Sequence, residues 1–132
     1  MKKNALLNSR QKRKLLFDKN ATPERIISCG ESFLREGRLS EAAELFSRAS
    51  YEEGLAQLRA LAMEQGDSFL YGVASKRSKE GNSKEAWETL GKKAMELRKY
   101  SHAVRAFRQA ENEASLKAAE EALQEVVSID KA

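Results

Sequence analysis

Apolar residues recur every three or four positions along most of the chain, and charged or small polar residues fill the positions between them. This spacing places the apolar residues on one face of an α-helix. The first clear case follows Thr22-Pro23, where threonine is a favoured N-cap and proline a favoured first helical residue. Gly37 stands where a left-handed cap would end that helix. We therefore predict a helix over residues 23–36.

Six further segments follow the same pattern. The helices that it predicts span residues 40–50, 51–65, 68–79, 84–98, 101–111 and 113–129. Several connectors are only two or three residues long, so consecutive helices are expected to pack as antiparallel pairs. The last helix carries Leu116, Ala119 and Leu123 on one side and charged residues on the other, which is typical of a solvent-facing capping helix.

Composition narrows the fold class. Valine, isoleucine and threonine together number nine among 132 residues, whereas alanine alone numbers 19 and leucine 15. So few β-branched residues favour an all-α fold over a sheet, with about seven helices and an N-terminal arm. The apolar runs are too short to cross a membrane or to form a signal peptide, and one cysteine cannot form an intramolecular disulfide. We expect no membrane span and a cytoplasmic location.

Positive charge is concentrated in the first 20 residues, which hold seven lysines and arginines and one aspartate. This segment has a charge of +6, so about −2 of the total of +4 belongs to the rest of the chain. Its apolar residues lie near the two ends of a polar middle, which predicts a basic arm over residues 1–21 that forms a conditional helix. The bases at its centre are Arg10, Lys12, Arg13 and Lys14.

The chain contains an internal repeat with an offset of 61 residues. The matching pairs are Gly30 with Gly91, Ser40 with Ser101, Ala42 with Ala103, Phe46 with Phe107, Ala49 with Ala110 and Leu55 with Leu116. Small residues at matching positions of two helices are expected where helix backbones approach closely, so this spacing indicates a helical repeat.

These residues resemble the tetratricopeptide repeat (TPR) family. Its unit carries a tryptophan followed by Leu-Gly on a first helix, and alanine, an aromatic residue and alanine on a second. The expected repeat core is Gly30, Phe33, Ala42, Phe46 and Ala49 in the first copy, and Trp87, Leu90, Gly91, Ala103, Phe107 and Ala110 in the second. The resemblance implies a short α-solenoid over residues 22–132, with regular units at about 23–56 and 84–117, an irregular hairpin at 57–83 and a capping helix at 113–129.

The resemblance also implies a partner-binding groove lined by the first helix of each unit. The matching positions are Glu24, Ile27, Glu31, Leu34, Glu85, Glu88, Lys92 and Met95. TPR domains that bind chaperones grip a terminal carboxylate with lysine, asparagine and arginine, and the positions of this chain that match those residues carry Glu, Ile and Met instead. Glutamates with a few apolar residues would suit a basic amphipathic segment of a protein partner, and a merely solvated charged face is the alternative.

The chain offers few candidates for chemistry. It has one histidine and one cysteine, and it lacks the zinc-binding and phosphate-binding motifs that metal or nucleotide hydrolysis requires. Cys29 is expected in the core, His102 in solvent, and Trp87 and Phe69 in the core. We therefore expect a protein that is no enzyme and has no cofactor, no metal and no catalytic residue.

These observations favour an adaptor or scaffold that binds a protein segment in a helical-repeat groove. The alternative is nucleic-acid or anionic-surface binding through the basic arm. A further hypothesis is that the arm occupies the groove of its own chain or of a second copy. In the second case the chain would form a homodimer.

Overall fold

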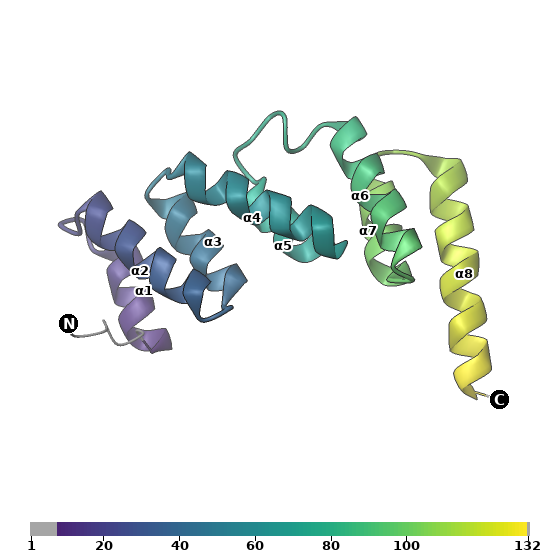
Figure 1. The fold of residues 1–132 in the computed structure, drawn as a ribbon, viewed down its shortest axis with the longest axis horizontal. Helices are drawn as coiled ribbons and strands as arrows, with labels where there is room; N and C mark the ends of the chain where they lie inside the picture. The colour runs from purple at the N-terminus through teal and green to yellow at the C-terminus, as the bar shows by residue number, and fades with distance from the viewer. Residues whose placement is uncertain (1–7, 132) are drawn as a thin grey trace. The chain divides into compact units, whose positions relative to one another are not determined.

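The computed structural model describes residues 8–131, and in this range the chain forms eight α-helices and no strand (Figure 1). The prediction of an all-α fold is confirmed. Residues 1–7 and 132, which include Lys2 and Lys3 of the predicted arm, lie outside the described residues.

The helices are α1 (Ser9–Phe17), α2 (Pro23–Arg35), α3 (Leu39–Arg48), α4 (Glu52–Gln65), α5 (Ser68–Ala74), α6 (Lys84–Glu96), α7 (Tyr100–Gln109) and α8 (Glu113–Lys131). They fall into two compact units, Met1–Leu58 and Arg59–Ala132, and the boundary lies inside α4. We describe each unit by itself.

In the first unit, α2 packs on α3 through an aromatic ring that lies against two glycines. A β-carbon on Gly30 of α2 would lie 2.5 Å from the ring of Phe46, and one on Gly54 of α4 would lie 2.6 Å from it. Phe46 and Ala42 of α3 are fully buried. Only the missing side chains of the two glycines make room for the ring, which explains why glycine stands within these helices.

Helix α1 contacts α3 through polar groups and also buries a leucine. Its capping box joins Asn8 and Gln11, and Leu15 is 6% exposed. Lys12 Nζ lies 3.1 Å from a carboxylate oxygen of Glu44, and Arg48 Nε donates to the carbonyl of Leu16 at 2.8 Å. The described part of the arm is therefore helical, and Lys12 pairs with α3 rather than with the groove glutamates of α2.

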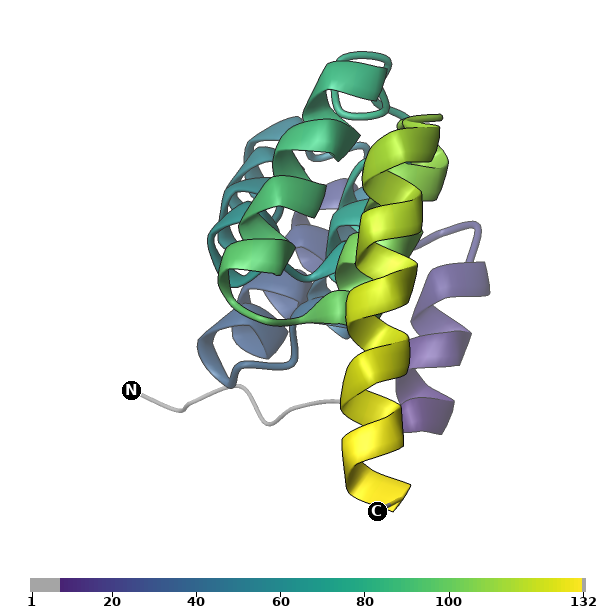
Figure 2. The ribbon, with the colours of Figure 1, turned by 90° about the vertical axis from the view of Figure 1, so that its right-hand side faces the viewer.

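The second unit repeats the aromatic packing. Helix α6 packs on α7, and a β-carbon on Gly91 would lie 2.5 Å from the ring of Phe107. Helix α8 covers the other side of α7 (Figure 2). The buried residues between these helices are Ala94, Ala103, Phe107 and Ala119, with Met95, Val104 and Leu116 packed against them.

The residues expected in the repeat core are all buried except Ala49. Ala49 is the C-cap residue of α3 and is half-buried. Its counterpart Ala110 occupies the same cap position on α7 and is 6% exposed.

Five helix ends share one turn geometry. In each, a backbone N–H bonds to the carbonyl five residues earlier, as in the bond from Lys99 to Ala94 at 2.8 Å. The residue before that N–H has a positive φ and is glycine at Gly37 and Gly66. At the other three ends it is Ser50, Arg98 or Glu111, with φ between 54° and 59°.

Helix α5 ends at Ala74, five residues earlier than the prediction of 68–79. The polar segment after Ala74 has no apolar stripe to bury, and its carbonyls find partners outside a helix. Arg59 Nη1 donates to the carbonyl of Ala74 at 3.0 Å, and Asn82 Nδ2 donates to that of Ser75 at 2.5 Å. These bonds satisfy backbone acceptors that would otherwise favour another helical turn.

We predict that Gly91→Ala destabilises the chain even though alanine favours a helix by about 1 kcal/mol over glycine. The added methyl group would overlap the ring of Phe107, and overpacking of this kind costs about 1–3 kcal/mol. Gly72→Ala in α5 is the matched control, since its β-carbon would lie 3.6 Å from Trp87 at ordinary contact distance. Urea denaturation should show a loss for Gly91→Ala and none for Gly72→Ala, whereas equal effects would contradict this packing.

Candidate binding cleft

Two apolar side chains of α5 point into solvent. Phe69 is 57% exposed and Val73 is 37% exposed. The prediction that Phe69 belongs to the core is wrong, because α5 buries Leu70, Tyr71 and Ala74 on its other side. A short helix that already buries this many residues presents its remaining apolar positions at the surface.

These side chains line a cleft between α5, α6, α7 and the loop before α6. Its volume is about 420 Å³, and the residues around it are Phe69, Gly72, Val73, Lys76, Asn82, Trp87, Arg105 and Gln109. All of them belong to the second unit. Sequence reasoning missed this cleft, and none of its lining residues is among the predicted groove positions.

Trp87 forms a wall of the cleft. It is 4% exposed, and its ring meets that of Tyr71 edge to face, with centroids 5.0 Å apart. Gly72 faces Trp87 without a side chain, which leaves this part of the wall open. Trp87 thus has the expected place in the core and also contributes apolar surface to the cleft.

The charge of the cleft is positive. The guanidinium of Arg105 lies 4.3 Å from the centre of the Phe69 ring, a cation–π contact, and Lys76 is exposed at the cleft edge. Of the described residues that line the cleft, none is acidic. Both cations therefore face the cleft without a counter-charge on its lining.

His102 holds the start of α5 in place. Its Nδ1 accepts the backbone N–H of Ser68 at 3.0 Å and lies 2.9 Å from the Ser68 hydroxyl. Its ring also meets Phe69 edge to face at 5.4 Å. The expectation that His102 is solvated is wrong, since α7 turns it toward the buried Ser68, where it satisfies a backbone donor at the helix start.

The predicted groove positions of α2 show a mixed surface. Glu24 is exposed in the first turn, and Ile27, Glu31 and Leu34 are half-buried. Burial, followed by the charges of Glu53 and Glu31, raises the pKa of Tyr51. The carboxylate of Glu31 therefore influences Tyr51, which immediately precedes α4 in the same unit.

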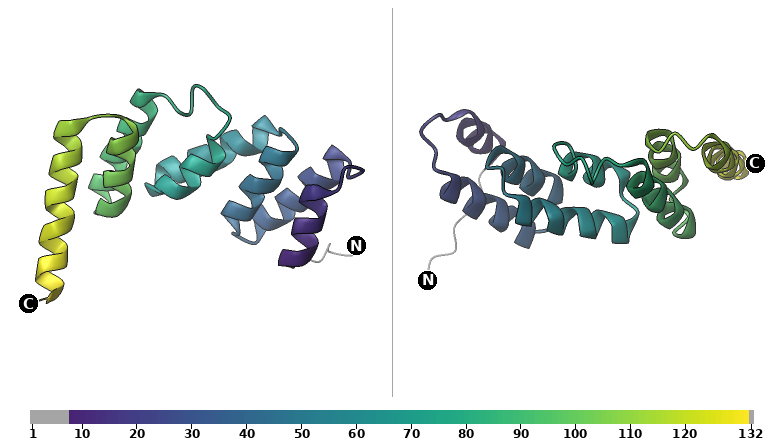
Figure 3. Two further views of the ribbon diagram at one scale, coloured as in Figure 1. Left: turned by 180° about the vertical axis from the view of Figure 1, so that it is seen from behind. Right: turned by 90° about the horizontal axis from the view of Figure 1, so that it is seen from above.

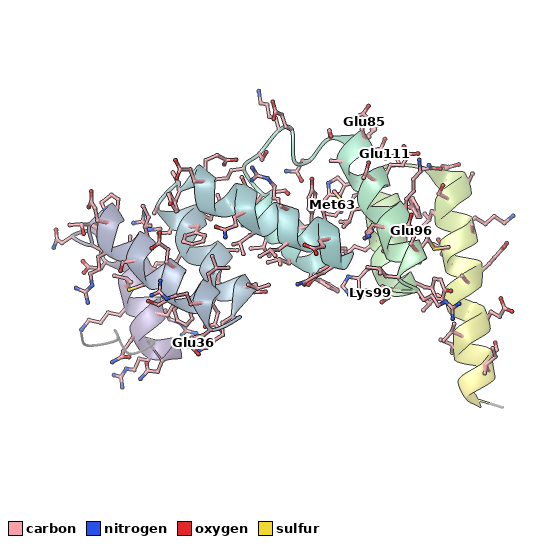
Figure 4. All side chains as sticks on the ribbon, viewed as in Figure 1. Glu36, Met63, Glu85, Glu96, Lys99 and Glu111 are labelled. Carbon is pink, nitrogen blue, oxygen red and sulfur yellow. The ribbon has the colours of Figure 1, made fainter. Side chains whose placement is uncertain are left out.

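Most of the predicted groove positions of α6 already contact other residues of the second unit. Glu88 accepts from Asn112 Nδ2 at 3.3 Å and lies 3.6 Å from Lys92 Nζ. Met95 is only partly exposed, because it packs against the cluster that α6, α7 and α8 bury. Glu85 remains exposed in the first turn of α6 (Figure 4).

The predicted basic residues of the arm fall into two groups. Arg10, Arg13 and Lys14 are exposed on α1. Lys12 is only 16% exposed and is paired with Glu44. Its charge is therefore used to hold α1 against α3, whereas the other three are open to an external anion.

Other chemical candidates are limited. Burial raises the pKa of the Cys29 thiol, and the charge of Arg25 opposes this only in part, which disfavours the reactive thiolate. Among residues 8–131, no three histidine, cysteine, aspartate or glutamate side chains are grouped so that they could hold a metal ion. None of the helices in this range has both the length and the apolar character needed to cross a membrane.

Comparisons of the chain with protein-family models, with curated proteins and with solved structures find no match. Its function must therefore be inferred from its own residues.

We predict that His102→Ala lowers the free energy of unfolding by about 1–3 kcal/mol, because it leaves the buried N–H of Ser68 without an acceptor. His102→Asn, which keeps an acceptor near the position of Nδ1, should lose less. Hydrogen exchange at the Ser68 amide should be faster in the alanine variant than in the parent chain. In the asparagine variant it should be slower than in the alanine variant. Equal exchange in both variants and the parent chain would rule out this anchoring role.

Proposed function

We propose that the chain is a non-enzymatic protein-binding module, an adaptor or scaffold that takes up a segment of another polypeptide. The observation that carries this proposal is the cleft of α5–α7, where Phe69 and Val73 are exposed beside Trp87. Exposed aromatic and aliphatic side chains around a concave site are typical of protein-recognition surfaces.

The architecture that we propose for this module is a short α-solenoid of antiparallel helix pairs, similar to TPR repeats. Its support is the repetition of one packing arrangement, with Phe46 against Gly30 in one unit and Phe107 against Gly91 in the other. Helical repeats of this kind expose extended surfaces to partners, in agreement with a binding role.

The cleft is a better candidate site than the first-helix groove for a physical reason. In the second unit, Glu88 and Met95 are already used by internal contacts, whereas Phe69 and Val73 are exposed to solvent. A partner gains most from surface whose apolar area is still in contact with water. The prediction that a partner binds in the groove of the first helices therefore has weaker support than the proposal that it binds in the α5–α7 cleft.

The test is a selection of peptides from a random display library on the full chain, followed by measurement of the affinity of each selected peptide for Val73→Asp. We expect enriched peptides that contain apolar residues and that bind the variant more than about tenfold more weakly, as loss of a central contact would produce. The substitution lies at an exposed position, so a thermal melt should show that the fold is kept.

Val127→Asp is the matched control, since Val127 of α8 is 36% exposed and lies outside the cleft lining. The selected peptides should bind it as they bind the parent chain. Peptides that bind all three proteins equally would show that the cleft is no binding site.

The exposed bases of α1 support a second candidate function, the binding of an anionic polymer. Arg10, Arg13 and Lys14 recur at helical spacing, so they lie on one face of α1 together with Phe17, which is 78% exposed. A row of cations beside an aromatic ring is a suitable surface for phosphates and bases of single-stranded RNA.

For this candidate we predict that the full chain binds poly(U) with a salt dependence that requires α1. Replacing Arg10, Arg13 and Lys14 together by alanine should reduce the slope of log K against log salt by about two. Lys12→Ala is the control, and because Lys12 is paired with Glu44 it should change the slope much less. Fluorescence anisotropy in a salt series measures both, and equal slopes for all three proteins would exclude α1 as the contact.

A further inference from the structure

The C-terminal part of α8 extends beyond the helix that it packs on (Figure 3). Helix α8 has 19 residues and α7 has 10, so at about 1.5 Å per residue α8 is almost twice as long. Its first half is held by the buried Ala119, whereas Val126 is 41% exposed and Ile129 is 67% exposed farther along. This end of α8 therefore presents apolar side chains that α7 does not cover.

The half-buried Ala122 and the exposed Val126 and Ile129 of α8 follow the spacing of a helix that inserts into a groove. Ala122, Val126 and Ile129 stand at positions i, i+4 and i+7, and thus on one stripe. Glu121 and Glu125 are exposed one turn apart and lie next to this stripe. The end of α8 is thus an acidic, apolar helical segment.

The cleft of the same unit has the complementary properties. It exposes Phe69 and Val73 as apolar surface, and its charged lining residues are Lys76 and Arg105. Its volume of about 420 Å³ suits a few aliphatic side chains better than a whole helix. The partner that fits this surface offers a short apolar row flanked by carboxylates, which is the chemistry of the end of α8.

We propose that the C-terminal end of α8 from a second copy of this chain docks in the α5–α7 cleft. This inference rests on the proposed function of the cleft as a protein-binding site and names its occupant. Within one copy, α5 and the end of α8 lie apart, and the packing of α8 on α7 keeps them so (Figures 1 and 3).

A reciprocal exchange satisfies both surfaces at once. Each copy carries one cleft and one free end of α8, so two copies related by a two-fold axis would bury both clefts and both helix ends. In this dimer Val126 and Ile129 contact Phe69 and Val73, and carboxylates of α8 approach Arg105 and Lys76. The same cleft remains open to other partners in the monomer, so self-association would compete with them.

The experiment measures the mass of the full chain by sedimentation equilibrium from about 1 µM to about 1 mM. We expect a monomer–dimer equilibrium in which Ile129→Ser weakens association more than about tenfold, since a central apolar contact is lost. Ile129 is exposed in the monomer, so this variant should keep the fold, as checked by circular dichroism. A chain that stays monomeric over the whole range would overturn the proposal.

Charge reversal identifies the contact. Arg105→Glu and Glu125→Arg should each weaken the dimer, because each places like charges together, and the chain with both substitutions should regain most of the lost association. The controls are Arg108→Glu on α7 and Glu120→Arg on α8, both at exposed positions outside the expected contact. A dimer that Arg105→Glu leaves unchanged would also overturn the proposal.

The two experiments together distinguish a failure of the dimer proposal from a failure of the proposed protein-binding function. If the chain is monomeric but selects peptides that depend on Val73, the cleft is a binding site and only its occupant is wrong. If it dimerises without dependence on the cleft and selects no such peptide, both proposals are wrong.

Discussion

The packing of an aromatic ring against a glycine of the preceding helix is the contact on which both units depend. Phe46 lies against Gly30, and Phe107 lies against Gly91, at distances that leave no space for a methyl group. The rings bring the helix backbones together, so Ala42 and Ala103 beside them are completely buried. Since interiors are packed as densely as organic crystals, one such contact fixes the rotation of a helix as well as its distance.

This fixed rotation determines where the polar side chains of α7 point. When Ala103, Ala106 and Phe107 face the core, His102 and Arg105 turn toward α5. His102 then anchors the first residue of α5, and Arg105 lies over Phe69. The cleft is thus a consequence of core packing one helix away, and Phe69 is held by polar and aromatic neighbours although it is exposed.

The sequence predicts the parts of the fold that repeat. The period of the apolar residues, the Thr22-Pro23 signal and the glycine at 37 locate helices to within a few residues, because each is a local property of the chain. The 61-residue offset also selects Gly30, Gly91 and their aromatic partners before any contact is known.

The cleft could not be predicted in this way. The apolar period assigns Phe69 to a helix face, but α5 carries apolar residues on more than one side, and the structure buries Leu70, Tyr71 and Ala74 and leaves Phe69 exposed. The turns at Arg98 and Glu111 also lack the glycine that would reveal them. A lone histidine gives no signal in the sequence for its bond to a backbone N–H 34 residues away.

The five turns with a left-handed residue have a consequence for how the chain can change in length. In each, the next helix begins six residues after the carbonyl that closes the turn, as from Phe46 to Glu52 and from Phe107 to Glu113. An inserted residue would rotate the following helix by about 100° and turn its apolar stripe away from its neighbour. The connection between α5 and α6 has no such turn, so insertions and deletions should accumulate between Ser75 and Ser83, where they would reshape one side of the cleft and leave the helix register intact.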